Sequence, residues 1–196
     1  MRGLVGLPLA LAELVVDACR AEAWRIGVPV AIATVDGQGG AQSFRRMDGT
    51  LPVSSELAMS KAFTAAVLRM STDALGRLAQ PGQPLFGIET SHGGKIVLFG
   101  GGFPLCLAGA VIGAVGVSGG SVEQDMQIGR AGLALLAAVE CWAERLKGAM
   151  PATLCPAVPM DRLKDGLERE ILGRPAEATE VEALKALIGG VLLALA

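Results

Sequence analysis

The sequence predicts an α+β domain in which an antiparallel five-stranded sheet packs against helices, followed by a C-terminal helical extension. Two observations lead to this fold class. Apolar residues recur at helical spacing in some segments and in short β-rich runs in others, and glycine-rich turns join consecutive runs closely enough for hairpins. Hairpin links make neighbouring strands antiparallel, and strands grouped apart from helices are typical of the α+β class.

The first half of the domain is predicted to hold three helices and one hairpin. A glycine closes the first helix, a glycine-rich turn separates the two strands, and serine caps open the two later helices. The expected elements are a helix over 9–26, strands over 28–35 and 41–47, a helix from Ser54 or Ser55 to about 70, and a short helix from Ser71 to about 80.

The second half is predicted to hold three strands and one long helix after a loop over 81–94. Ser121 and Gln124 have the spacing of a capping box, in which each side chain binds the other residue's backbone N–H. The expected elements are strands over 95–99, 104–108 and 110–117, and a helix from Ser121 to about 147.

The composition is apolar for a chain of 196 residues. Hydrophobic residues make up 52% and charged residues 18%, and the mean hydropathy is +0.51. Excess apolar surface is typically buried between subunits, so we expect a homo-oligomer. The net charge is −2, and the basic pair Arg45-Arg46 has no aromatic residues interleaved, which argues against a nucleic-acid partner.

Two segments imitate membrane-associated sequences. Residues 96–122 carry no charge, but Gly100-Gly101-Gly102, Pro104 and Gly119-Gly120 divide them into strand-length pieces, so we expect a buried hairpin and no membrane partner. The N-terminus resembles a signal peptide. Its apolar helical face nevertheless continues through the small-residue site Ala10-Leu11-Ala12, which favours a structural helix.

The cysteines do not indicate a metal site. Cys19, Cys106, Cys141 and Cys155 lie far apart without a C-x-x-C pair, and the chain has one histidine, His92. A structural zinc needs four clustered ligands, so no metal is expected. The helical and strand patterns around the first three cysteines indicate buried thiols in the reducing cytoplasm.

Lys61 is the first candidate site residue. The helix expected over 54–70 is apolar around nearly its whole circumference, which indicates burial on more than one side, and Lys61 is the one charge in its middle turns. We expect Lys61 to be mostly buried and paired with Glu123, with Asp125 or with an anionic ligand, because an unpaired buried ammonium is costly. The alternative is that its stem carries the ammonium to solvent at a helix edge.

A second candidate is the corner where the strand over 110–117 meets the long helix. Free backbone N–H groups there favour a carboxylate or phosphate ligand, unless the acidic residues of the helix complete its dipole themselves. We expect a small-ligand pocket between this corner, Lys61 and the preceding glycine turn. The predicted ligand-binding residues are Lys61, Gly101, Gly102, Phe103, Pro104, Ser118, Gly119, Gly120, Glu123 and Asp125.

Three segments carry a family resemblance: VPVAIATVDGQGGAQSFRRMDG, SSELAMSKAFTAA and GGGFPLCLAGAVIGAVGVSGGSVEQD. They resemble the GlcG/HbpS-like haem-binding family, which includes the C-terminal domain of PduO-type proteins, over about residues 9–147. The resemblance implies an antiparallel five-stranded sheet, assembly as dimers and often octamers, and association with haem or a corrinoid. Similar proteins bind haem through a histidine, often in the first helix. Here that helix has none, so His92 and Cys19 are the candidate axial ligands.

Beyond the domain, residues 1–150, the chain is expected to continue as a proline-containing linker over 151–159 and an amphipathic helical extension over 160–196. A helix this short is marginal alone in water and needs a partner surface. Residues 176–196 resemble in kind the short peptides that direct cargo into bacterial microcompartments. The alternative is that the extension folds back on its own oligomer.

Three functions remain open from the sequence. The first is an oligomeric accessory protein that binds a small ligand or cofactor (haem, a corrinoid or a small organic acid) in small-molecule catabolism, within the cytoplasm or a microcompartment there. The second is an enzyme in which a buried Lys61 acts as base or Schiff-base former on a small carbonyl compound or hydroxy acid, with Glu123 or Asp125 as the acid. The third is a structural scaffold.

Overall fold

The computed structural model describes residues 6–107, 109–149 and 175, and gives only the course of the helix for residues 140–149. Its order of helices and strands agrees with the predicted order except that residues 95–99 form no strand and the predicted loop over 81–94 contains a 3₁₀ segment. The described elements are α1 (Leu9–Arg25), β1 (Ala31–Asp36), β2 (Ala41–Arg46), α2 (Val53–Leu68), α3 (Thr72–Leu78), the 3₁₀ segment η1 (Ile88–Gly94), β3 (Gly102–Leu107), β4 (Ala110–Ser118) and α4 (Val122–Ala149).

The sheet is antiparallel throughout, with the strand order β2-β1-β4-β3. It has four strands in the described part of the chain, so the prediction of five is wrong for the segment 95–99. The backbone of that segment bonds to a side chain of α2 rather than to a strand. The Val97 N–H donates to Thr64 Oγ1 over 3.0 Å, and the Thr64 hydroxyl lies 3.3 Å from the Lys95 carbonyl oxygen.

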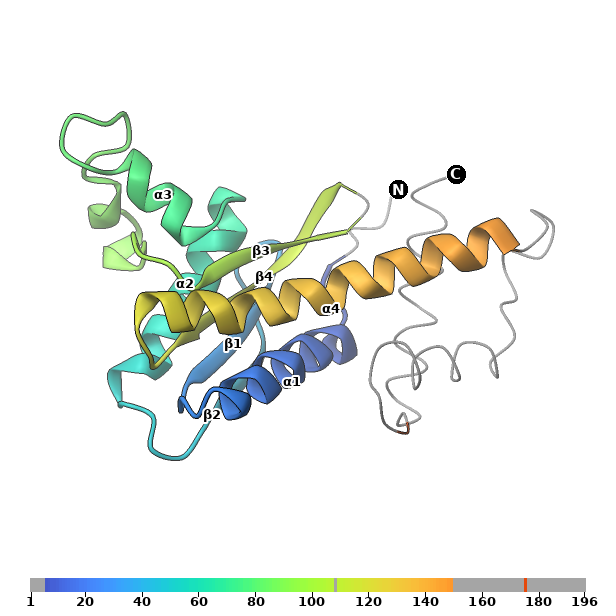
Figure 1. Ribbon diagram of the computed structural model, residues 1–196. Helices are drawn as coiled ribbons and strands as arrows, with labels where there is room; N and C mark the ends of the chain where they lie inside the picture. Colours follow the sequence, from blue (N-terminus) through green and yellow to red (C-terminus); the bar gives the residue numbers. More distant parts are fainter. Residues whose placement is uncertain (1–5, 108, 150–174, 176–196) are drawn as a thin grey trace.

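Helices cover both faces of the sheet. Figure 1 shows α1 and α4 side by side in front of the sheet and α2 behind it, and the contacts among these elements agree with this arrangement. The linker and the helical extension predicted for 151–159 and 160–196 lie outside the described residues. No helix in the described part of the chain combines the length and apolar character needed to cross a membrane.

The two faces of the sheet carry side chains of different size. Residues packed with α1 and α4 are mostly large, whereas those packed with α2 are mostly alanine. The larger set from the strands and the turn before β1 is Val30, Ile32, Phe103, Leu105, Leu107, Ile112, Val115 and Val117. The α2 face is built from Ala31, Ala33, Val35 and Ala114 of the sheet against Ala58, Ala62, Ala65 and Ala66 of the helix.

Gly116 brings α2 into direct backbone contact with β4. A Cβ atom at this position would collide with the Ala58 carbonyl oxygen and would lie 2.5 Å from the Ala62 backbone nitrogen. Small residues on both surfaces therefore let the helix backbone approach the sheet, which places the middle of α2 next to the end of β4.

Three local predictions need correction. Ser71 stands at the N-cap position of α3, but its side chain makes no capping hydrogen bond. Neither Ser54 nor Ser55 caps α2, because the helix begins at Val53, after Pro52, without a side-chain cap, and Ser54 lies buried inside its first turn. Cys106 is exposed rather than buried. It lies at the register shift of β3, where the neighbouring Leu105 is buried in the core.

We expect Gly116→Ala to destabilise the fold by about 1–3 kcal/mol or more, because the added methyl group must push α2 away from β4. Urea unfolding measures the change in the free energy of unfolding. Gly6→Ala is the matched control, since a Cβ there meets nothing within 4 Å. Equal stability of both variants would contradict the proposed backbone contact.

Candidate functional site

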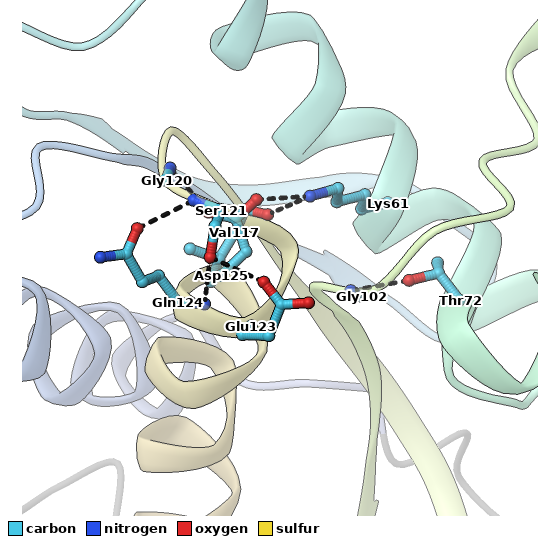
Figure 2. Close-up of polar contacts among 9 residues, drawn as sticks. All are labelled: Lys61, Thr72, Gly102, Val117, Gly120, Ser121, Glu123, Gln124 and Asp125. Atoms are coloured by element: carbon cyan, nitrogen blue, oxygen red, sulfur yellow. Dashed lines mark hydrogen bonds and ion pairs between the residues drawn. The ribbon is translucent and has the colours of Figure 1, made fainter.

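The fold brings together the two predicted regions around one buried ion pair. Lys61 extends from the middle of α2, and Asp125 comes from the first turn of α4 (Figure 2). Lys61 Nζ donates to Asp125 Oδ2 over 2.7 Å and to the Val117 carbonyl oxygen over 2.9 Å. The side chains of Lys61 and Asp125 are 0% and 4% exposed. The expectation of a buried, paired Lys61 is therefore confirmed, with Asp125 rather than Glu123 as the partner.

Phe99 covers the remaining side of the ammonium. Its ring centroid lies 4.7 Å from Lys61 Nζ, a distance at which the face of an aromatic ring attracts a cation. Phe99 is itself 42% exposed, whereas the Lys61 side chain is 0% exposed, so the aromatic residue lies on the solvent side of the ion pair. Sequence reasoning missed Phe99. Phe99 directly precedes the glycine turn that was predicted to line the site, and this position could have drawn attention to it. Its neighbours in the sequence do not indicate that it would face Lys61 of α2.

The backbone donors at the corner after β4 are bound by the protein itself. The Gly120 N–H donates to Asp125 Oδ1 over 3.0 Å, and the Ser121 N–H donates to Gln124 Oε1 over 2.9 Å. The Gln124 N–H in turn donates to Ser121 Oγ over 3.3 Å, which confirms the predicted capping box. The acidic residues of α4 thus bind donors at the N-terminus of their own helix. This is the alternative to a bound ligand that the sequence analysis left open.

Glu123 has a separate role from Asp125. It is exposed and accepts a hydrogen bond of 2.8 Å from the Ser121 hydroxyl. Its own backbone N–H and this hydroxyl lower the pKa of the Glu123 carboxyl group. The structure therefore places Glu123 outside the buried pair, on the solvent side of the helix N-terminus.

The glycine turn before β3 packs against the ion pair without intervening side chains. A Cβ at Gly101 would lie 2.8 Å from Lys61 Nζ and 2.6 Å from the Val117 carbonyl oxygen, and the residue has φ +116°. The Gly102 N–H donates to Thr72 Oγ1 over 3.0 Å, as Figure 2 shows. These two glycines are thus required for close packing around Lys61. Thr72 was not among the predicted site residues.

The remaining predicted site residues lie around this centre with different exposure. Phe103 and Ser118 are buried, Pro104 and Gly119 are partly buried, and Gly120 is exposed. Phe103 packs in the core, where a Cβ at Gly129 of α4 would meet its ring. Binding of a ligand by this group of residues stays a prediction.

Burial dominates the protonation of the ion pair. Loss of hydration lowers the pKa of Lys61, and the nearby Asp125 carboxylate opposes this shift. Loss of hydration likewise raises the pKa of Asp125, against the effect of Lys61 and of the Gly120 and Gly119 backbone N–H groups. Each charge therefore depends on the other, because neither is hydrated.

The two candidate haem ligands lie in different environments. Cys19 is buried between α1 and α4, where burial raises the pKa of its thiol to about 12. Its side chain is 0% exposed, so the core encloses the sulfur and separates it from any surface ligand. His92 is exposed in η1, so its imidazole is accessible to a ligand. No group of three His, Cys, Asp or Glu residues in the described part of the chain could hold a metal ion.

We expect Lys61→Met to destabilise the protein by about 3–5 kcal/mol, because it leaves the buried Asp125 without a partner. The double variant Lys61→Met/Asp125→Leu should recover much of this loss, since it removes both unhydrated charges. Urea unfolding of the four forms of this cycle measures the coupling free energy.

Glu123→Gln is the control for this cycle, because it changes an exposed carboxylate in the same turn of α4. A surface substitution of this kind changes stability by about 0.5 kcal/mol or less. A Lys61→Met variant no less stable than Glu123→Gln would show that the ion pair does not organise the fold.

Comparisons with known proteins agree with the fold. A family model described as "Haem degrading protein HbpS-like" matches residues 7–134. The chain is 40% identical over 138 residues to an uncharacterised 15.0 kDa protein from the dhaT-dhaS intergenic region of Citrobacter freundii, which covers 70% of this chain and 93% of that protein. It is 45% identical over 114 residues to corrinoid adenosyltransferase PduO of Salmonella typhimurium, which covers 58% of this chain but 34% of that enzyme.

A solved structure is similar to this chain over the same domain. The crystal structure of a PduOC–haem complex superposes with a TM-score of 0.64 at 41% sequence identity, and the match covers 66% of this chain and 94% of the other. The family resemblance inferred from the three sequence segments is therefore confirmed. The chain belongs to the HbpS-like family.

Proposed function

We propose that this protein is an oligomeric haem-binding accessory protein of small-molecule catabolism. The observation that carries the proposal is the similarity to the PduOC–haem complex, which extends over 94% of that chain. The chain spans about a third of the corrinoid adenosyltransferase that it also matches, so the proposal concerns binding of a tetrapyrrole and not the transferase reaction.

The residues present offer haem one accessible nitrogen ligand. His92 is the chain's one histidine, and its side chain is exposed. Cys19, the other candidate, is enclosed in the core as a protonated thiol. The chemistry that a bound haem supplies is an iron centre that accepts an axial ligand, and among these two candidates only the imidazole can reach it.

The enclosure of Lys61 favours the accessory-protein proposal over an enzyme that uses this lysine as its reactive group. Its ammonium is bound to Asp125 and Val117 and covered by Phe99, so within the described residues it faces no open space for a carbonyl compound. A Schiff-base lysine must expose a neutral amine to its substrate. The pair is better suited to hold the domain rigid while another surface binds the cofactor.

Exposed apolar side chains support the oligomeric part of the proposal. Trp24 on α1, Leu51 before α2 and Phe86 before η1 are each more than 60% exposed. Aromatic residues are enriched where protein surfaces meet. For the segment 176–196 we retain the proposal that it docks on a microcompartment protein.

We expect haemin added to the full-length protein to give a saturable shift of the Soret band, because axial coordination of the iron by the protein changes the haem spectrum. The same titration in a concentration of urea that unfolds the protein is the control. Spectra identical to haemin in buffer throughout the titration would overturn the proposed function. A parallel titration with cobalamin tests whether a corrinoid binds instead.

We expect deletion of residues 151–196 to leave the oligomer intact, because a docking segment is dispensable for assembly of the domain. Light scattering at micromolar concentration measures the mass of the full chain and of the shortened chain. Residues 176–196 fused to a fluorescent protein should co-localise with microcompartment shell proteins. A monomeric full-length protein would contradict assembly, and dissociation on deletion would contradict a docking role for the tail.

A further inference from the structure

β2 (Ala41–Arg46) ends the sheet on one side without a further strand in the described part of the chain. In the strand order β2-β1-β4-β3, the two edge strands are β2 and β3. The edge of β3 is poorly suited to an added strand, because Pro104 has no backbone N–H and the Gly102 N–H already donates to Thr72 Oγ1. β2 contains no proline. An open edge of this kind readily pairs with another strand.

The bonds between β1 and β2 show which residues of β2 face outward. The Met47 N–H donates to the Val30 carbonyl oxygen over 3.0 Å, one step beyond the end of β2. In an antiparallel ladder, residues that bond to the neighbouring strand alternate with residues whose backbone groups face the other way. Since Met47 bonds toward β1, the backbone N–H and carbonyl groups of Arg46 and Phe44 face away from the sheet.

Phe44 presents both its backbone and its ring at this edge. Its carbonyl oxygen accepts a hydrogen bond of 3.1 Å from Arg45 Nη1, a side chain of its own strand, which agrees with an outward-facing carbonyl. Phe44 lies opposite Ala33, so its ring is on the α2 face of the sheet. α2 packs mainly against β1, β3 and β4, and Phe44 is 39% exposed. The edge therefore combines outward-facing backbone groups with an uncovered aromatic ring.

Ser43 lacks a partner on the other face of β2. The residue is 8% exposed, and its hydroxyl oxygen is buried without a hydrogen-bond partner among the described residues. Buried polar groups are normally satisfied, so this hydroxyl indicates a missing donor or acceptor. Arg45 lies two residues along, on the same face, and is exposed, with its nearest carboxylate oxygen on Glu13 at 3.8 Å.

We propose that β2 pairs antiparallel with β2 of a second copy of this chain, about a two-fold axis at Phe44. The pairing joins the two sheets into one continuous sheet through the backbone groups that face outward. The inference rests on the oligomeric part of the proposed function, for which it names the surface and the partner.

The sequence of β2 is complementary to itself in this register. The axis places Phe44 opposite its own copy and Gln42 opposite Arg46 of the second copy. Ser43 then faces Arg45 of the second copy, whose guanidinium group supplies a donor for the hydroxyl. Aromatic pairs and polar pairs across strands are favourable. Centring the pair on Arg45 or Arg46 would instead set an arginine against its own copy, which is unfavourable.

The first test is oxidative cross-linking of the full-length Phe44→Cys variant. Bonded residues that face each other in an antiparallel pair have Cα atoms about 5.5 Å apart, within the reach of a disulfide. Ala41→Cys is the matched control, an exposed residue of the same strand. In the proposed register the two copies of residue 41 lie about 20 Å apart, too far for a disulfide.

We expect Phe44→Cys to give about tenfold more covalent dimer than Ala41→Cys on non-reducing electrophoresis, and a reducing agent should reverse it. The wild type, which has four cysteines of its own, is treated in the same way and should resemble Ala41→Cys.

The second test places a charge on the axis. Phe44→Glu sets two carboxylates opposite each other, so light scattering should give at most half the mass of the wild type. Gln83→Glu adds the same charge at an exposed residue of the loop after α3 and should keep the wild-type mass. Circular dichroism checks that both variants fold.

The outcomes distinguish the surface from the function. A wild-type oligomer whose Phe44→Cys form gives no more covalent dimer than Ala41→Cys would overturn this pairing and leave the edge to a strand of another protein. Wild-type mass in Phe44→Glu would overturn it as well. A monomeric wild type would overturn both the pairing and the oligomeric part of the proposed function. Specific cross-linking in a protein that binds no haemin would uphold the pairing and overturn the haem-binding part.

Discussion

The ion pair of Lys61 and Asp125 is the interaction on which the arrangement of this domain depends. It connects α2 on one side of the sheet to α4 on the other, past the end of β4, whose Val117 carbonyl oxygen is its third member. Neither charge is hydrated, so each requires the other. The pair therefore specifies how the two helix layers meet at this end of the sheet. Two apolar side chains could also pack there, but their contact would not fix the relative orientation of α2 and α4.

The glycine-rich turns are consequences of this centre. Gly101 leaves space for the Lys61 ammonium, and Gly116 allows the α2 backbone to lie against β4, so that the lysine reaches the end of that strand. Alanine on the facing surfaces serves the same close approach. The glycines at these positions thus allow close packing between the layers. The backbone N–H of Gly120 is bound by Asp125 of α4.

Function is then expected at a surface that the rigid centre supports. Phe63 and Thr64 lie in the turn of α2 that follows Lys61, and they hold the loop that presents His92. The residues that stabilise the domain and those that support the His92 loop are consequently neighbours on one helix. The relation to a haem-bound solved structure concerns the whole domain, whereas the position of the histidine is a property of this chain.

Local patterns were sufficient for much of this structure. The sequence alone determined the helices, the hairpins β1–β2 and β3–β4 and the capping box at Ser121, and it favoured burial of Lys61, because periodicity, turn residues and the cost of an unpaired charge act over short distances. Only the tertiary structure decided which carboxylate meets Lys61 and that residues 95–99 bind Thr64 instead of forming a strand. These outcomes depend on which segments distant in the sequence pack together, and periodicity carries no information about that choice.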